Sequence, residues 1–428
     1  MLASLLRATS GSFILTVITR RQYGQFFRCN MHGKIGRREQ AIVEELRQIF
    51  AAQFSNIVLQ EIRKVEELHK TPIPAGEQKF TVMSYNVLAQ DLIENHRGLY
   101  PTQDPEDLKW ENRKKKLIGE IKTQNPDILA MQEVQQSHIP LFYNDLEKIG
   151  YKGVFKRRTE NNTDGVAVYY KTDVFDLVFW TSVEYYQPGI EYLNRPNVGL
   201  IVRLKLRQGN GELFLANTHL LYNPKRWKVR LAQTQILLTE LHRIIKMAKT
   251  SSPALLLMGD LNSRPGSPVV RFLESGFVRV YDQLLPLSLG ILNNCTHLGE
   301  SKLYNSDYTF HQKTNEQPNC RASPSFVKKF DQCPGEALHK NAMLEAGVLS
   351  HNFNFSSVYN LTEDEKYGTA TTHHDKWVTV DYMFYSNLRL LSRLRLPTVD
   401  ECKNFVQPMP NRISPSDHFP LLATFSML

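Results

Sequence analysis

Cysteine is scarce in this sequence, and its placement excludes the structures that cysteine-rich chains form. The 428 residues include five cysteines, at Cys29, Cys295, Cys320, Cys333 and Cys402, and no two of them make a C-x-x-C pair. An odd count without such a pair argues against a disulfide framework and against a zinc site. Long apolar runs are absent too, since no segment approaches the roughly eighteen consecutive apolar residues of a membrane-spanning helix. We therefore expect a protein of a reducing compartment without a membrane span.

Acidic residues are missing from the N-terminal segment. Between Met1 and Arg38 there is no Asp or Glu, while several Arg and Lys residues flank an apolar run from Phe13 to Ile18. This composition is typical of a mitochondrial transit peptide. A weak secretory signal and an unstructured basic tail are the alternatives. We expect a cytoplasmic protein, with mitochondrial import through residues 1–38 as the alternative.

The overall charge is positive. The formal net charge is +9, although charged residues make up an ordinary 22% of the chain. Such a balance favours a polyanionic partner through long-range attraction. The alternative is a basic surface that only keeps the protein soluble. Hydrophobic residues make up 42% of the chain, which is enough for a sizeable core.

The spacing of apolar residues divides the chain. Residues 39–70 have apolar positions at steps of three and four, which predicts an amphipathic helix that packs on the following domain or on a partner. A Pro- and Gly-containing linker ends at residue 76, and the main domain follows at 77–428. Within it, residues 284–375 are rich in Asn, Ser, Thr, Lys and Pro, which indicates an insertion. Its aromatic side chains either stack on bases or form surface with a little core; they include Tyr304, Tyr308, Phe310 and His311.

From residue 80 onward, segments with strand character alternate with helical ones. Two helices are predicted, one over Lys109–Ile121 and one between Asn217 and Ala254 that contains Trp227. The expected strands are Phe80–Met83, Pro126–Met131, Gly165–Tyr170, Leu213–Ala216, Ala254–Met258, Thr379–Tyr385 and Leu421–Phe425. This mixture predicts a layered α/β or α+β domain of about 350 residues.

Six short polar signatures stand at or just past the ends of apolar runs. They are Ser84-Tyr85-Asn86, Gln132-Glu133, Asn217-Thr218-His219, Gly259-Asp260-Leu261-Asn262, Val380-Asp381-Tyr382 and Ser416-Asp417-His418. Strand ends can converge at one edge of a sheet although they are far apart in sequence. The signatures therefore predict one active site.

The residue types suit metal-dependent cleavage of phosphodiesters. That reaction requires neutralisation of the phosphoryl oxygens, activation of water and stabilisation of the charge that develops in the transition state. Oxygen ligands suit Mg²⁺, for which Mn²⁺ can substitute. Glu133 is the expected metal carboxylate, helped by the amide oxygen of Asn86.

The remaining signatures supply acid–base groups. Asp260 is expected to orient and deprotonate the attacking water, and Asn262 to hold that water or a phosphate oxygen. His418 would donate to a phosphate oxygen as an imidazolium, while Asp381 accepts its other N–H and fixes its orientation.

Two further residues complete the predicted set. His219 would add a second contact, neutral or positive, and Asp417 would tune His418 or approach a second metal. Taken singly, each signature could equally be a turn residue or a structural partner. It is their joint presence that indicates catalysis.

A basic cluster follows the His219 signature. It consists of Lys225, Arg226, Lys228 and Arg230, near the start of the predicted helix that contains Trp227. Side chains and backbone N–H groups at a helix N-terminus can face a phosphate backbone, so this cluster is predicted to bind a nucleic acid. The alternative is a solvated helix face with Trp227 in the core.

In this order, the six signatures resemble the endonuclease/exonuclease/phosphatase superfamily. Additional segments are similar to its deadenylase and nocturnin branch, and within that branch to the Angel proteins. They are Asp164-Gly165-Val166-Ala167-Val168, Asn197-Val198-Gly199-Leu200, Leu220-Leu221-Tyr222-Asn223-Pro224 and Ser267-Pro268.

The resemblance implies an α+β fold, a DNase I-like four-layer α/β/β/α sandwich of two packed mixed β-sheets flanked by helices. It also implies Mg²⁺-dependent hydrolysis at RNA 3′ ends, foremost of terminal 2′,3′-cyclic phosphates. The alternative in the same class is a 3′–5′ poly(A)-specific exoribonuclease. An alternative of another class is a non-catalytic protein that binds RNA or translation factors. The expected partners are RNA and proteins of translation or mRNA decay.

Overall fold

The computed structural model describes residues 56–69, 74, 76–187, 193–209, 211–279, 348–362, 368–373 and 375–427. The chain divides into two compact units, Met1–Phe54 and Ser55–Leu428, and all described residues belong to the second. The predicted N-terminal segment, most of the helix expected over 39–70 and the insertion aromatics lie outside the described residues. No helix in the described part of the chain is long and apolar enough to cross a membrane.

A seven-stranded mixed sheet forms one half of the core. Its strands run in the order β1 (Val65–Glu67), β16 (Arg389–Leu394), β17 (Leu421–Met427), β2 (Gln78–Asn86), β3 (Ile128–Gln135), β5 (Asp164–Lys171) and β4 (Tyr151–Arg157). Strands β2 and β3 are parallel, and the other neighbours are antiparallel.

A six-stranded mixed sheet forms the other half. Its order is β12 (Ser356–Ser357), β15 (Asp381–Ser386), β9 (Ala254–Asp260), β8 (Glu212–His219), β7 (Val198–Leu206) and β6 (Phe175–Glu184). Here β8 and β9 are the parallel pair. Two small two-stranded sheets join β10 (Phe277–Arg279) to β11 (Val348–Ser350) and β13 (Thr372–His373) to β14 (Trp377–Val378).

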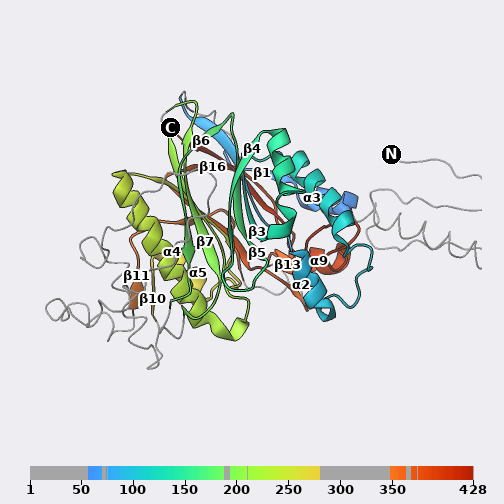
Figure 1. The fold of residues 1–428 in the computed structure, drawn as a ribbon. Helices are drawn as coiled ribbons and strands as arrows, with labels where there is room; N and C mark the ends of the chain where they lie inside the picture. The colour runs from blue at the N-terminus through green and yellow to red at the C-terminus, as the bar shows by residue number, and fades with distance from the viewer. Residues whose placement is uncertain are drawn as a thin grey trace, which may run out of the picture. The chain divides into compact units, whose positions relative to one another are not determined.

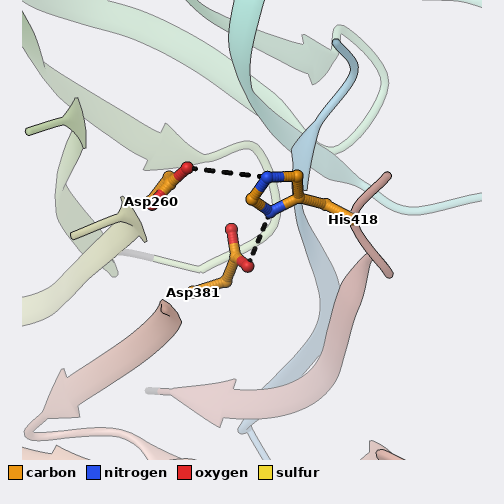
Figure 2. A group of neighbouring side chains, drawn as sticks. All are labelled: Asp260, Asp381 and His418. Atoms are coloured by element: carbon orange, nitrogen blue, oxygen red, sulfur yellow. Dashed lines mark hydrogen bonds and ion pairs between the residues drawn. The ribbon is translucent and has the colours of Figure 1, made fainter. Parts of the chain in front are cut away.

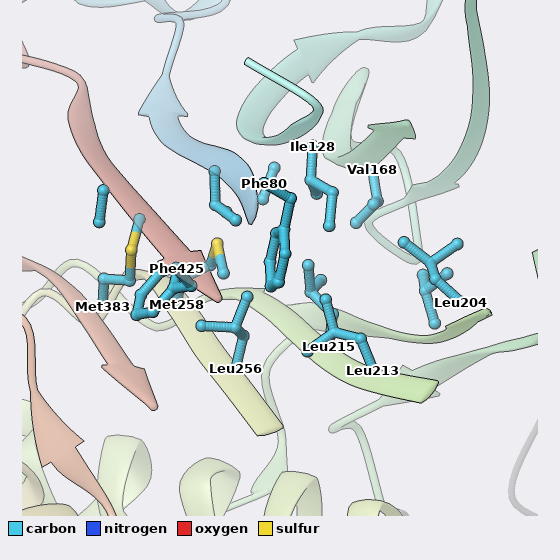
Figure 3. Close-up of a cluster of buried hydrophobic side chains, with 14 of the residues drawn as sticks. Phe80, Ile128, Val168, Leu204, Leu213, Leu215, Leu256, Met258, Met383 and Phe425 are labelled. Atoms are coloured by element: carbon cyan, nitrogen blue, oxygen red, sulfur yellow. The ribbon is translucent and has the colours of Figure 1, made fainter. Parts of the chain in front are cut away.

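The two large sheets pack face to face around one apolar core. Phe80, Ile128 and Val168 from the first sheet meet residues of the second such as Leu256 and Met258 (Figure 3). Side chains alternate along a strand, so Leu256 and Met258 of β9 face this core while their neighbours Leu255 and Leu257 face the opposite side. Since both faces are buried, the strand is an unbroken apolar run, as its sequence shows.

Helices cover the outer faces of both sheets. Helix α3 (Trp110–Gln124) packs Leu117 and Ile121 on the first sheet. Helices α4 (Trp227–Ala248) and α5 (Pro268–Ser275) cover the second (Figure 1). Shorter helical segments are α2 (Gln90–Asn95), η1 (Arg97–Leu99), η2 (Gln136–His138), η3 (Tyr143–Ile149), η5 (Pro224–Arg226) and α9 (Val399–Phe405). The layers run helix, sheet, sheet, helix, so the predicted four-layer sandwich is confirmed.

Two predicted boundaries differ from the structure. The helix expected through residue 70 ends early: residues 56–62 are helical, whereas Val65–Glu67 pair with β16 as an edge strand. Open backbone groups at the edge of β16 outweigh the local helical spacing there. The C-terminal part of the predicted insertion also belongs to the fold, because Leu349, Phe355 and Tyr359 are buried and Ser356–Ser357 pair with β15.

Candidate active site

Strand ends from both sheets meet at one edge. In the parallel pair β2 and β3, Asn86 lies opposite Gln132 at their carboxyl ends. In the parallel pair β8 and β9, His219 lies opposite Asp260, and Asp381 begins the neighbouring antiparallel strand β15, also opposite Asp260. The structure thus brings the distant signatures together, as the sequence predicted.

A β-bulge directs Glu133 into the site. Gln132 and Glu133 stand where the pairing of β3 with β5 shifts register between Met131 and Val134, and Glu133 has φ of 57°. A bulge re-aims a side chain, and a left-handed conformation is strained for a residue other than glycine. The Glu133 carboxylate accepts hydrogen bonds from Asn86 Nδ2 at 3.0 Å and from the Ala89 N–H at 3.1 Å.

Asn86 links the two sheets. Its Nδ2 donates to Glu133 Oε1 and to Asp260 Oδ2, both at 3.0 Å. Its Oδ1 accepts the Leu88 N–H at 3.1 Å. The amide nitrogen, and not the oxygen expected as a metal ligand, faces the carboxylates, because a carboxylate can only accept. Asn86 in this orientation positions Glu133 and Asp260.

His418 lies between three carboxylates. Its Nδ1 is 2.9 Å from Asp381 Oδ2, and its Nε2 is 3.8 Å from Asp260 Oδ2 (Figure 2). The same Nε2 is 3.9 Å from Asp417 Oδ1. Burial by itself lowers the pKa of this imidazole. The charges of Asp381, Asp417 and Asp260 and the hydrogen bond to Asp381 outweigh burial and raise the pKa well above its ordinary value. The raised pKa favours the imidazolium form of His418.

Asp260 is almost fully buried. Burial is the largest cause of its raised pKa, followed by the charge of Asp381. Positive charge on His418, the Asn262 N–H and Asn86 Nδ2 oppose that shift. Ligand atoms of Asp260, Asp381 and His418 lie within 4.8 Å of one another. Because an imidazolium has no lone pair to offer a metal ion, the two carboxylates of this group are the candidate ligands. Glu133 adds a further carboxylate, and Asn86 donates hydrogen bonds to both Glu133 and Asp260. This excess of buried negative charge fits a divalent cation.

Asn262 and Gly259 flank Asp260. The Asn262 N–H donates to Asp260 Oδ1 at 2.9 Å, and its Nδ2 donates to the Leu220 carbonyl at 2.9 Å. That amide therefore joins the loops after β8 and β9. Glycine is required at position 259 by the neighbouring strand. At its φ of 139°, a Cβ would lie 1.9 Å from the Thr218 carbonyl oxygen, so only glycine allows the two strands to approach.

His219 stays neutral. Burial and then the nearby charge of Arg158 lower its pKa to about 4. Its Nε2 lies 3.5 Å from Asp260 Oδ2, while its Nδ1 is buried without a hydrogen-bond partner in the described part of the chain. Of the two forms predicted, the structure favours the neutral one.

Sequence reasoning missed two residues that hold the site together. Arg113 of α3 is buried and donates to the carbonyls of Val87, Leu88 and Pro415, so it joins the loop after Asn86 to the loop before His418. Tyr100 donates its hydroxyl to Asp417 Oδ2 at 3.0 Å. In the sequence, Arg113 stands four residues before Leu117, on the same face of the predicted helix. That spacing also fits an exposed cation, so it did not identify Arg113 as a buried residue.

The four residues of the basic cluster differ in exposure. Lys225 and Arg226 are exposed, and Lys228 is half-buried with its Nζ 5.7 Å from the Trp227 ring centroid. Arg230 is buried, and its guanidinium donates to the Leu221, Asn223 and Pro224 carbonyls and to Ser263 Oγ. Arg230 therefore holds a loop and is not available to RNA, in contrast to the prediction.

Two packed mixed sheets with buried Asp, Asp and His at one edge define a hydrolase of phosphoester bonds with a DNase I-like fold. The chain belongs to the endonuclease/exonuclease/phosphatase family, which it matches over residues 83–418, and within it to the Angel homologues. The family resemblance seen in the sequence is confirmed.

Individual relatives give the extent of the likeness. The chain is 33% identical to Protein angel homolog 2 of Danio rerio, over 82% of this chain and 66% of that protein. It is 31% identical to Protein angel homolog 1 of Homo sapiens, over 82% of this chain and 63% of that protein. The chain thus spans about two thirds of the length of these relatives.

Solved structures agree with the fold. The crystal structure of ANGEL2, a 2′,3′-cyclic phosphatase, in complex with adenosine-2′,3′-vanadate is 34% identical with a TM-score of 0.67, covering 85% of this chain and 98% of that one. The human nocturnin catalytic domain with bound sulfate is 22% identical with a TM-score of 0.51, covering 86% of this chain and 98% of that one, and it supports the fold alone.

Proposed function

We propose that this chain is a metal-dependent phosphodiesterase that hydrolyses terminal 2′,3′-cyclic phosphates at RNA 3′ ends. The observation that carries the proposal is the buried group of Asp260, Asp381 and His418, with Glu133 joined to it through Asn86. The likeness to ANGEL2, described as a 2′,3′-cyclic phosphatase, supports the cyclic ester as the substrate.

Glu133 would hold Mg²⁺ or Mn²⁺ with the help of the neighbouring carboxylates. The cation would neutralise the phosphoryl oxygens and lower the repulsion that an incoming nucleophile meets. Asn86 keeps Glu133 and Asp260 at a fixed separation, because one amide group donates to both.

Asp260 is the proposed acceptor of the proton of the attacking water. Its carboxylate is oriented by the Asn262 N–H and Asn86 Nδ2, which leaves little freedom to the side chain. As the water oxygen bonds to phosphorus, one of the two ribose P–O bonds breaks, and the released ribose oxygen takes up a proton.

His418 stabilises the charge that develops on a phosphate oxygen. It is an imidazolium whose Nδ1–H is given to Asp381, so Nε2–H is directed toward the site beside Asp260. Neutral His219, whose Nε2 lies 3.5 Å from Asp260 Oδ2, would add a further polar contact.

Two RNAs with the same A-tailed sequence test the proposal, one ending in a 2′,3′-cyclic phosphate and one in a 3′-hydroxyl. With purified protein and Mg²⁺, we expect the cyclic end to open to a phosphomonoester while the A-tail stays intact. Shortening of the A-tail with an intact cyclic end would instead show a 3′–5′ exoribonuclease. Retention of both RNAs without conversion would favour a binding protein. Asp260→Asn serves as the inactive control for contaminating nucleases.

A further inference from the structure

An aromatic side chain stands exposed close to the catalytic strand ends. Strand β8 ends at His219, and Tyr222 follows three residues later with 53% of its surface exposed. An exposed tyrosine contributes little to a core. Its surroundings show that its place is nevertheless fixed.

The backbone on both sides of Tyr222 is tied down by buried side chains. Arg230 donates to the Leu221 carbonyl at 3.2 Å and to the Asn223 carbonyl at 2.5 Å. Gln233 Oε1 accepts the Leu221 N–H at 3.1 Å. Arg230 and Gln233 of helix α4 are buried, and through them the helix holds this loop in place. The backbone that carries Tyr222 is therefore held in place, while about half of its side chain is exposed to solvent.

The same loop is bonded to the catalytic carboxylate's strand. The Leu220 N–H donates to the Asp260 carbonyl at 2.9 Å, and Asn262 Nδ2 donates to the Leu220 carbonyl at 2.9 Å. In agreement with this link, partial burial and then the charges of Asp375, Asp417 and Asp260 raise the pKa of Tyr222. Tyr222 therefore borders the active site.

A rigidly mounted, solvent-facing aromatic ring beside a phosphodiester site suits a nucleobase. Bases stack on aromatic side chains with little regard to sequence, because every base has a π face. A tyrosine also loses little conformational entropy on binding compared with a longer side chain.

We propose that Tyr222 is the platform on which the base of the reacting nucleoside stacks. The inference rests on the proposed function, since it assigns the base of that same substrate. Arg230 acts as a positioning residue, holding the loop that carries the ring.

The test compares a substrate that has a base with one that lacks it. Adenosine 2′,3′-cyclic phosphate and the 2′,3′-cyclic phosphate of methyl β-ribofuranoside present the same reacting group, and only the first offers a base. For Tyr222→Ala we expect kcat/KM on adenosine 2′,3′-cyclic phosphate to fall by roughly 5-fold to 150-fold, the range of one base–aromatic stack. Turnover of the base-less sugar should stay within about 2-fold, since it never used the ring.

Two control variants sharpen the comparison. Tyr222→Phe keeps the ring and should retain wild-type kinetics on both substrates. Phe277→Ala removes an equally exposed aromatic ring, 50% exposed, from β10, which carries no site residue, and should change neither rate.

Three outcomes would overturn the platform. Wild-type turnover of the nucleoside by Tyr222→Ala would show that the ring is not used, and an equal loss on both substrates would show a structural role. If the wild-type protein hydrolyses neither cyclic phosphate, the proposed function is wrong, independently of the platform. The platform is then judged by equilibrium binding of oligoadenylate, and unchanged affinity in Tyr222→Ala would refute it.

Discussion

Asp260 and Asp381 stand directly opposite each other on the neighbouring antiparallel strands β9 and β15. Like charges in facing positions repel, and burial makes that repulsion stronger. His418 lies beside both: its Nε2 is 3.8 Å from Asp260 Oδ2 and its Nδ1 is 2.9 Å from Asp381 Oδ2 (Figure 2). One imidazolium cannot balance these two carboxylates together with Glu133. This surplus of negative charge fits a bound cation, which would supply the further positive charge.

Removal of divalent metal should abolish activity. We expect EDTA to stop hydrolysis and Mg²⁺ or Mn²⁺ to restore it, because no basic side chain donates to the Glu133 carboxylate among the hydrogen bonds of the described residues. Mg²⁺ should also raise the melting temperature of the wild-type protein, since a ligand of the folded state stabilises it. Glu133→Ala should lose both effects while keeping its circular dichroism spectrum. Full turnover of that variant in chelator would contradict the metal assignment.

Substitution of the proposed acid–base groups should affect chemistry more than binding. Asp260→Asn and His418→Ala should each lower the single-turnover rate by on the order of 10²-fold to 10⁴-fold, because such groups act mainly in the transition state. RNA affinity, measured by fluorescence anisotropy, should persist. A wild-type rate in either variant would remove the role assigned to that residue.

The part of the basic cluster that is not buried remains a predicted RNA contact. Arg226→Ala combined with Lys228→Ala should weaken binding with little dependence on sequence. It should also flatten the plot of log affinity against log salt by roughly one unit per lost phosphate contact. Turnover at saturating substrate should survive, since neither residue has a chemical role. An unchanged salt slope would show that this face only meets water.

The stability of the fold should fall in mild acid through His351. Burial lowers the pKa of this histidine to about 4, and its Nε2–H donates to the Phe272 carbonyl while Nδ1 accepts the Phe353 N–H. The folded state therefore keeps the ring neutral, whereas the unfolded chain takes up a proton below its ordinary pKa of 6.5. The stability that this group contributes is fully present above pH 6.5 and is lost as the pH falls toward 4.

The expected loss over that window is on the order of 3 kcal/mol. Urea unfolding of the wild type and of His351→Gln, at several pH values between 4 and 7.5, measures it. Glutamine can still donate and accept but does not titrate, so the difference between the two curves should shrink as the pH falls. Parallel curves would show that His351 is protonated equally in both states.

Much of the fold follows from local pattern. The apolar run Ala254–Met258 predicts a strand buried on both faces, and Leu256 and Leu257 do face different cores. Polar residues directly after such a run, as in Gly259-Asp260, predict a site at the sheet edge, because strand ends gather there whichever sheet they join. The chemical roles given to the site residues stay predictions; these residues are Glu133, Asp260, Asn262, Asp381, His418, His219 and Asp417.

Other features depended on contacts between distant segments. Val65–Glu67 is a strand only because β16 presents an open edge to it, and Arg230 is buried because the carbonyls of a loop close over its guanidinium. Asn86 turns its amide nitrogen to two carboxylates that come from different sheets. The sequence by itself therefore determined the strands that carry the site, the order of the polar signatures and the family. Only the tertiary structure decided protonation, desolvation and hydrogen-bond direction, because these depend on which groups meet in space and not on neighbours along the chain.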